Sequence, residues 1–224
     1  MKHIFRRPNF SQGFSFVELI VAIAIITTLS AIFLFNYGSF ERRVTINILA
    51  HQIAGWVYDA QVSAMSVKRA RNEAGRFPGY GLYFDMATVN KFIFIADLNG
   101  NRVYDPYDSV TSTCGDPSEE CEQEIILLRG NTIASLCGNM PSSGGQSQNC
   151  ASANPAYPPL YPTGVINIVF ARPNPFDATI WGDVNTAVFP QVPTAYTNAE
   201  IAVTSSKGYR NTVTIWSTGQ VSVR

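Results

Sequence analysis

The chain has 224 residues and a formal net charge of zero, and 14% of its residues are charged. This length suits one globular domain of about 150 residues together with an additional segment, and such a domain can bury a core without metals or crosslinks. With no excess of Lys and Arg, the composition gives no indication of a nucleic-acid-binding protein.

Residues 1–13 form a short basic leader that contains Lys2, Arg6 and Arg7 and no acidic residue. An apolar run follows from residue 14 to residue 37, and about 20 such residues cross the bilayer core as a helix. By the positive-inside rule, the leader stays in the cytoplasm and the rest of the chain is exported.

One carboxylate, Glu18, interrupts the apolar run near its start. An ionised side chain in the middle of a bilayer costs roughly 2.5–3.5 kcal/mol, and less near an end. A cleaved signal peptide has a shorter apolar stretch, of about 7–15 residues. A plain membrane anchor explains the length of the run, but it explains neither Glu18 nor the preceding Gly13-Phe14.

Beyond Gly38 the apolar residues recur at steps of three or four, which predicts an amphipathic helix over residues 38–77. Because no Pro lies between Pro8 and Pro78, one helix is expected to run from Phe14 to about Arg71. Its first half favours lipid or other helices, and its second half favours a sheet. The basic residues near its end are expected to complement the helix C-terminus, or alternatively to bind a partner subunit or DNA; they are Lys68, Arg69, Arg71 and Arg76.

Residues 78–224 are predicted to form an exported β-rich domain, with a loop insert over residues 114–162. The last 24 residues predict a meander with turns at Ser206-Lys207-Gly208 and Thr218-Gly219. The strands expected from alternation and turn residues are Tyr80–Asp85, Lys91–Asp97, Glu124–Arg129, Val165–Arg172, Glu200–Ser205, Arg210–Trp216 and Gln220–Arg224.

The four cysteines, Cys114, Cys121, Cys137 and Cys150, all follow the apolar run. Because the exported side of the membrane is oxidising, disulfides are expected. Four cysteines allow three pairings. The local pairs, Cys114–Cys121 and Cys137–Cys150, close the shortest loops and are favoured. The spacing does not suit a zinc site, since it contains no C-x-x-C and no nearby His.

The segment DLNGNRVYDPYD is the one candidate metal site. Its oxygens fall at the spacing of an EF-hand-like calcium loop, although Gly100 is fourth instead of sixth and Asp108 is shorter than the usual Glu. An alternative interpretation is a metal-free β-hairpin with an Asn-Gly turn, and a third is a protein-contact loop. The candidate ligands are Asp97, Asn99, Asn101, the Val103 carbonyl, Asp105 and Asp108.

Enzyme motifs are missing from the sequence, which contains no H-E-x-x-H, no G-x-S-x-G and no P-loop. The two histidines are His3 in the leader and His51 on the predicted helix, so a His-dependent nucleophile in the β domain is excluded. We therefore expect a protein that is not an enzyme and that has no cofactor other than the candidate Ca²⁺.

The order MKHIFRRPNFSQG followed by FSFVELIVAIAI resembles the amino terminus of type IV prepilins and type II secretion pseudopilins. The resemblance implies that prepilin peptidase removes the leader after Gly13 and that Phe14 becomes an N-methylated amino terminus. It also implies that Glu18 pairs with the amine of a neighbouring subunit. A buried carboxylate in a dry bundle is retained when a cation meets it.

The long helix, the sheet and the final meander resemble the GspH/FimT group of minor pilins and pseudopilins, which implies an α+β fold with a long N-terminal helix on an antiparallel β-sheet domain. The expected partners are other pilins and prepilin peptidase. The expected location is the bacterial inner membrane, with a periplasmic C-terminal domain, and then the filament. An alternative is a DNA-binding minor pilin, with Lys207, Arg210 and Arg224 as candidate contacts, although removal of the leader leaves the chain near −3.

Overall fold

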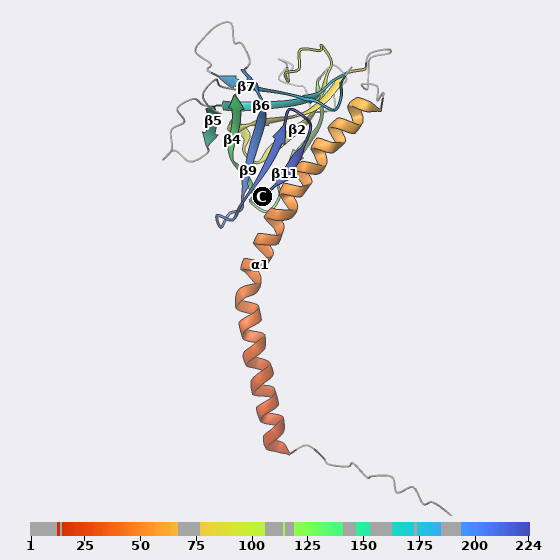
Figure 1. Ribbon diagram of the computed structural model, residues 1–224. Helices are drawn as coiled ribbons and strands as arrows, with labels where there is room; N and C mark the ends of the chain where they lie inside the picture. The colour runs from red at the N-terminus through yellow and green to blue at the C-terminus, as the bar shows by residue number, and fades with distance from the viewer. Residues whose placement is uncertain are drawn as a thin grey trace, which may run out of the picture. The chain divides into compact units, whose positions relative to one another are not determined.

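The computed structural model describes residues 13, 15–66, 77–105, 114, 119–140, 147–152, 163–172, 174–184 and 194–224. The chain divides into two compact units, residues 1–41 and residues 42–224. Helix α1 (Phe16–Met65) is followed by antiparallel strands and a short 3₁₀ helix, η1 (Met86–Thr88), so the expected α+β class is confirmed (Figure 1).

The first unit contains the apolar part of α1. Every residue from Phe16 to Leu34 is exposed within the chain, and this stretch is long and apolar enough to cross a membrane. The hydroxyls of Thr27 and Thr28 donate to the Ala24 carbonyl at 3.0 Å, which satisfies these polar groups inside the helix. Apart from Glu18, the segment is therefore compatible with a hydrocarbon environment.

The part of α1 in the second unit is amphipathic, as its sequence predicts. Ile46, Ile53, Val57 and Ala60 are fully or almost fully buried and belong to one core cluster with the sheets. Spacings of seven, four and three residues place them on one face of the helix. The helix ends at Met65, whereas the sequence predicts an end near Arg71; residues 67–76 and their four basic side chains lie outside the described residues.

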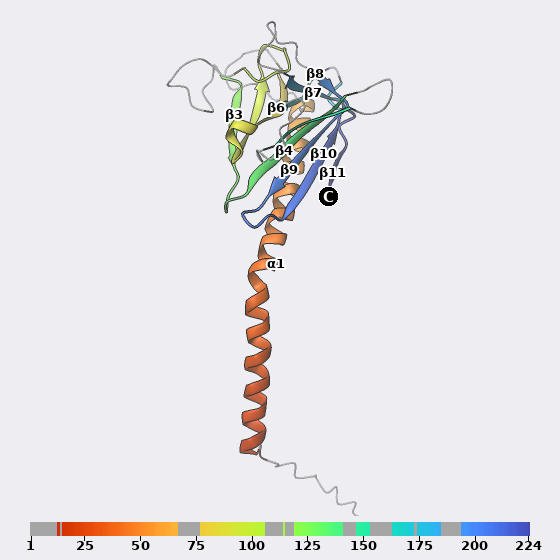
Figure 2. The ribbon, with the colours of Figure 1, turned by 90° about the vertical axis from the view of Figure 1, so that its left-hand side faces the viewer.

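Two antiparallel sheets make up the β part of the second unit (Figure 2). The first has the strand order β3-β2-β1-β6-β7-β8, and the second, which we call sheet B, has the order β11-β10-β9-β4-β5. The first sheet contains β1 (Gly79–Asp85), β2 (Lys91–Asp97), β3 (Cys121–Ile126), β6 (Thr163–Phe170), β7 (Ala178–Val184) and β8 (Thr194–Tyr196). Sheet B contains β4 (Thr132–Met140), β5 (Ser147–Ser152), β9 (Asn198–Thr204), β10 (Arg210–Trp216) and β11 (Val221–Val223).

Strands β1, β2 and β10 agree with the sequence to within one residue at each end, and the three-strand meander β9-β10-β11 is confirmed. The prediction of Glu124–Arg129 was displaced, because β3 begins at Cys121 and ends at Ile126. Strands β4, β5, β7 and β8 were not predicted. The insert was expected to be loop, yet β4 and β5 pair within it from Ser135 to Ser152.

Close backbone approach explains a glycine within the sheets. A Cβ atom added at Gly81 in β1 would lie 2.3 Å from the Ile168 carbonyl oxygen of β6, the strand beside it. A glycine at this position therefore permits the observed packing of the first sheet.

Candidate assembly site and polar clusters

The predicted assembly residue, Glu18, lies in the first turn of α1. The Leu19 amide donates to the Ser15 carbonyl at 3.1 Å, so the turn that contains Glu18 is hydrogen-bonded from its start. The free amides at a helix N-terminus favour a negative charge, which makes this the electrostatically favoured end for a carboxylate. Gly13 is exposed, and Phe14 lies outside the described residues.

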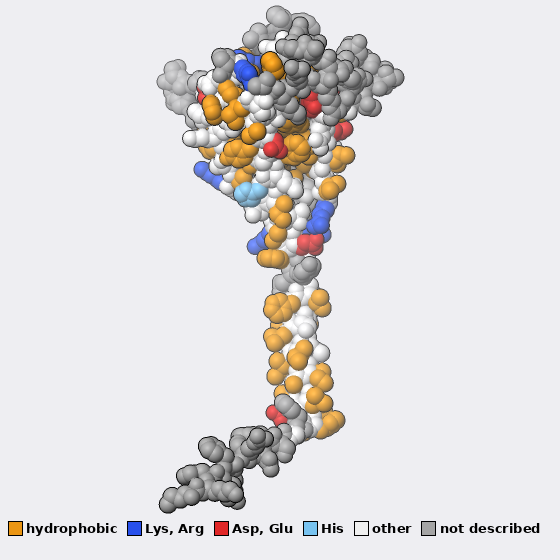
Figure 3. Space-filling model, turned by 90° about the vertical axis from the view of Figure 1, so that its right-hand side faces the viewer, with side chains coloured by type: hydrophobic (Ala, Val, Ile, Leu, Met, Phe, Trp, Pro, Cys, Tyr) orange, Lys and Arg blue, Asp and Glu red, His pale blue; other side chains and the backbone are white. Residues whose placement is uncertain are grey.

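The surface around and beyond Glu18 is apolar. Hydrophobic side chains cover this part of α1, and Phe16, Phe33 and Leu34 are each 76% exposed within the chain (Figure 3). Contiguous apolar surface of this extent marks a membrane or protein interface. The stretch from Phe16 to Leu34 thus combines one carboxylate with a surface that needs lipid or other apolar helices.

The candidate calcium loop forms a hydrogen-bonded turn after β2. The Asp97 carboxylate accepts from the Gly100 amide at 2.8 Å and from the Arg102 amide at 3.0 Å. Arg102 and Gly100 have positive φ angles of 65° and 79°, and β2 has β1 on one side and β3 on the other, so the described residues 98–105 form no strand beside it. The Asn-Gly hairpin interpretation was therefore wrong.

The asparagine side chains of this loop also contact neighbours within it. The Asn99 and Asn101 side-chain amides both donate to Oδ2 of Asp105, at 2.7 and 2.5 Å. Their side-chain oxygens accept from the backbone amides of Asn101 and Val103, both at 2.8 Å. Four of the predicted calcium ligands thus hold one another in place.

Within the described residues, no group of three or more His, Cys, Asp or Glu side chains is placed to hold a metal ion. Asp108, the last ligand of the predicted set, lies outside those residues. Calcium binding stays a prediction, and its test is the melting temperature of the full chain in uncharged detergent. Millimolar Ca²⁺ should raise that temperature relative to millimolar Mg²⁺, and an unchanged value would remove the idea.

Glu120 was not predicted from the sequence, although it completes this cluster. Its carboxylate accepts from the Leu98 amide at 3.2 Å and from the Asp105 amide at 2.9 Å, and its side chain is only 4% exposed. Burial, reinforced by the nearby Asp97 carboxylate, raises the pKa of Glu120 to about 7. Burial also raises the pKa of Asp97.

These shifts predict a stability that falls as pH rises. Between about pH 4.5 and pH 7 the folded Glu120 keeps a proton that the unfolded chain releases, so unfolding becomes easier as pH increases through this window. The free energy of unfolding should drop by up to about 3 kcal/mol. Thermal denaturation of the full chain from pH 4.5 to pH 8 measures it. The slope should flatten in Glu120→Gln, and an identical slope in this variant would contradict the assignment.

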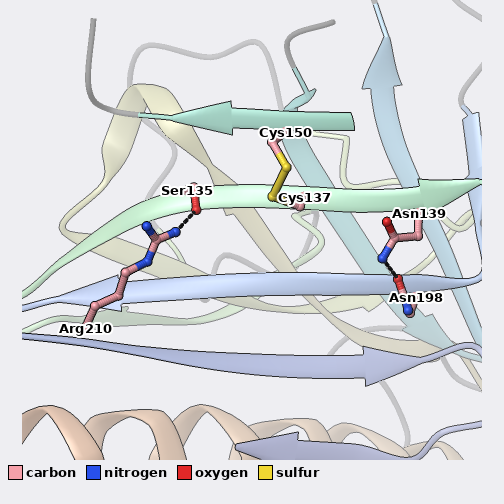
Figure 4. The surroundings of a disulfide bond; sticks show 6 residues. All are labelled: Ser135, Cys137, Asn139, Cys150, Asn198 and Arg210. Carbon is pink, nitrogen blue, oxygen red and sulfur yellow. Dashed lines mark hydrogen bonds between the residues drawn. A yellow bond between two sulfur atoms is a disulfide. The ribbon is translucent and has the colours of Figure 1, made fainter. Parts of the chain in front are cut away.

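Two of the three candidate DNA contacts share one face of sheet B, and the third lies in a turn of that sheet. Because Val213 is in the core and pairs with Val223, Arg210 and Arg224 share the opposite face of the sheet. Lys207 is exposed in the turn between β9 and β10. Arg210 donates to the Ser135 hydroxyl at 2.5 Å (Figure 4). DNA binding by these residues stays a prediction.

Both favoured local disulfides are present in the structure, Cys114–Cys121 and Cys137–Cys150. Cys137 and Cys150 are directly opposite each other in the β4–β5 ladder, so this bond joins two strands of sheet B (Figure 4). Cys121 begins β3, and its bond to Cys114 fixes the chain on the amino-terminal side of that strand.

Arg172 is a structural residue that the sequence did not indicate. Its guanidinium donates to the carbonyls of Ala64 and Met65 at 3.2 and 2.7 Å, at the end of α1. The last carbonyls of a helix lack partners within the helix in general, and a cation also complements the helix dipole there. The residue lies more than a hundred positions from the helix end, so no local pattern reveals this role.

The amino-terminal segment matches the family model described as the prokaryotic N-terminal methylation motif, over residues 8–34. The match supports a type IV pilin-like protein. It includes Gly13, Phe14 and Glu18, and such a motif implies processing by prepilin peptidase and assembly with other pilins. Comparisons with the curated proteins and with the solved structures find no match. The similarity shown by sequence is therefore confined to the leader and the apolar helix.

Proposed function

We propose that the chain is a minor pilin or pseudopilin of the GspH/FimT group, a structural subunit of a type IV pilus or a type II secretion pseudopilus. The observation that carries this proposal is Glu18 in the first turn of an exposed apolar helix that matches the methylation motif. In lipid this carboxylate lacks a cation. In a bundle of processed subunits, the Phe14 amine of a neighbour supplies one.

The assembly step follows from the same chemistry. Before processing, the leader keeps the amino terminus of residue 14 within a peptide bond, where it carries no charge. Cleavage after Gly13 creates the α-amine, which N-methylation leaves cationic. Apolar helices then exchange lipid contacts for contacts with each other, and the paired charges set their register.

Cleavage itself is the first test of this function. Coexpression with a prepilin peptidase should shorten the chain by the 13 leader residues, and mass spectrometry should show an N-methylated Phe14. A Gly13→Val variant should remain uncut, because the branched side chain would block access of the peptidase to the peptide bond after residue 13. Wild-type chain that stays full length with active peptidase would contradict the proposal.

Deletion of the gene distinguishes between the filament systems to which this subunit can belong. Loss of protein secretion supports the pseudopilus, and loss of twitching supports the type IV pilus. Loss of DNA uptake with normal twitching would favour the alternative of a DNA-binding minor pilin.

A further inference from the structure

Three segments that are distant in the sequence converge at one end of the second unit: residues 42–45 at the start of this unit's part of α1, the loop of residues 128–131, and the turn of residues 205–209. Arg42 Nη1 donates to the Ser206 hydroxyl at 2.8 Å, and the Arg129 guanidinium donates to the Thr45 hydroxyl at 3.5 Å. Thr132 of β4 is paired with Thr204 of β9, so the loop and the turn lie at the same end of sheet B (Figure 2).

This end of the unit is rich in cations, and we call it the basic surface. Residues 38–46, 128–135 and 204–210 contain one acidic residue, Glu41. Four of the five cations are exposed, and Arg42 is half-buried. The cations are Arg42, Arg43, Arg129, Lys207 and Arg210.

Neutral groups orient several of these side chains. Arg42 and Arg210 donate to serine hydroxyls, and the Arg43 guanidinium lies 5.0 Å from the centre of the Tyr209 ring. A hydroxyl or an aromatic face holds a guanidinium in place and leaves its positive charge intact. The basic surface thus contains guanidinium groups that are held in place and can donate hydrogen bonds to an anion.

The connectivity of the chain keeps this surface within reach of a bilayer. Arg42 follows Leu34, the last residue of the membrane-compatible stretch, by only eight positions along a helix, which corresponds to about 12 Å. We propose that the basic surface binds the phosphate groups of anionic lipids while the chain is anchored in the membrane. Its site would be the exported leaflet, and it would hold the second unit against the headgroups.

The same chemistry also suits a phosphate outside a lipid, or the backbone of DNA. Lipid is favoured because four of the five cations lie in the three segments that meet where the chain enters the second unit, and Arg210 adjoins the third segment, whereas Arg224 follows β11. Guanidinium groups form paired hydrogen bonds with phosphate, and each cation near an anionic lipid surface strengthens binding about fivefold.

The test uses native mass spectrometry of the full chain in uncharged detergent, with phosphatidylglycerol, phosphatidylcholine or glycerol 3-phosphate added. The wild type should bind phosphatidylglycerol at least about tenfold more tightly than phosphatidylcholine. The triple variant Arg42→Gln, Arg43→Gln, Lys207→Gln should lose that preference. A control triple variant, Lys91→Gln, Arg102→Gln, Arg224→Gln, removes the same charge elsewhere and should keep it. All forms carry the same leader, so its cations contribute equally to lipid binding in each of them.

If the triple variant melts at a lower temperature than the wild type, its loss of binding could reflect unfolding. Two single substitutions in exposed positions then provide the test. Lys207→Glu should weaken phosphatidylglycerol binding about fivefold or more, and Arg224→Glu should not. Equal binding by wild type and Lys207→Glu would overturn the proposal. Glycerol 3-phosphate bound as tightly as the lipid would also overturn it. A DNA gel shift abolished by Lys207→Glu would assign the basic surface to nucleic acid instead.

Discussion

Replacement of Glu18 by Ala is expected to leave membrane insertion intact and to reduce incorporation into filaments by at least about tenfold. The reason is that insertion depends on the apolar run and the leader, which the substitution preserves, whereas assembly depends on the carboxylate. A processed subunit without Glu18 leaves the amine of its neighbour unpaired in an apolar bundle, and an unpaired buried charge costs about 3–5 kcal/mol. Membrane fractionation measures insertion, and quantitative immunoblotting of sheared filaments measures incorporation.

Two further variants separate charge from packing. Glu18→Gln keeps the shape of the side chain and should fail like Ala, since it supplies no negative charge. Asp59→Ala removes an exposed carboxylate from the same helix within the second unit and should assemble normally. Recovery of Glu18→Ala in sheared filaments at the wild-type level would contradict the proposed pairing of Glu18 with the amine of a neighbouring subunit.

The largest expected effect on folding comes from Gly219→Ala. Gly219 has φ +76° in the turn between β10 and β11, and an added Cβ would lie 2.1 Å from the Phe176 carbonyl oxygen. A residue with a side chain is strained at this φ, and a backbone atom cannot yield as a flexible side chain does. The variant should lose about 2–4 kcal/mol of unfolding free energy, or roughly 5–15 °C in melting temperature.

Gly164→Ala is the matched control for that experiment. An added Cβ at this position in β6 meets nothing within 4 Å, and its φ lies outside the left-handed range. Its melting temperature should stay within about 2 °C of the wild type. Similar losses in both variants would show that the conformation of the β10–β11 turn is not the cause.

The sequence was most informative where the signal is local and continuous. The leader, Gly13 and Glu18 form an unbroken pattern, and the family model matches this stretch from residue 8 onward. The buried stripe of α1 and strands β1, β2 and β10 follow from periodicity, because buried apolar side chains recur along the helix at steps of three or four and along each strand at alternate positions.

The missed features depend on partners far away in the chain. Strand β5 is polar, with the sequence SQNCAS, and it exists beside β4, which in turn pairs with β9 some 60 residues later. Glu120 lies about 20 residues from Leu98, and its carboxylate accepts a hydrogen bond from the Leu98 amide. Arg172 lies between β6 and β7 and donates to a carbonyl at the end of α1. No short pattern encodes such pairings, since tertiary contact selects them.

The most direct test of the central claim is mass spectrometry of filaments sheared from the cell surface or, for a pseudopilus, isolated after overassembly. We predict a peptide of this chain that begins with N-methylated Phe14 in the filament fraction, at a much lower level in the Glu18→Ala strain. A chain that carries the mature amino terminus but is found only in the membrane fraction would contradict the account.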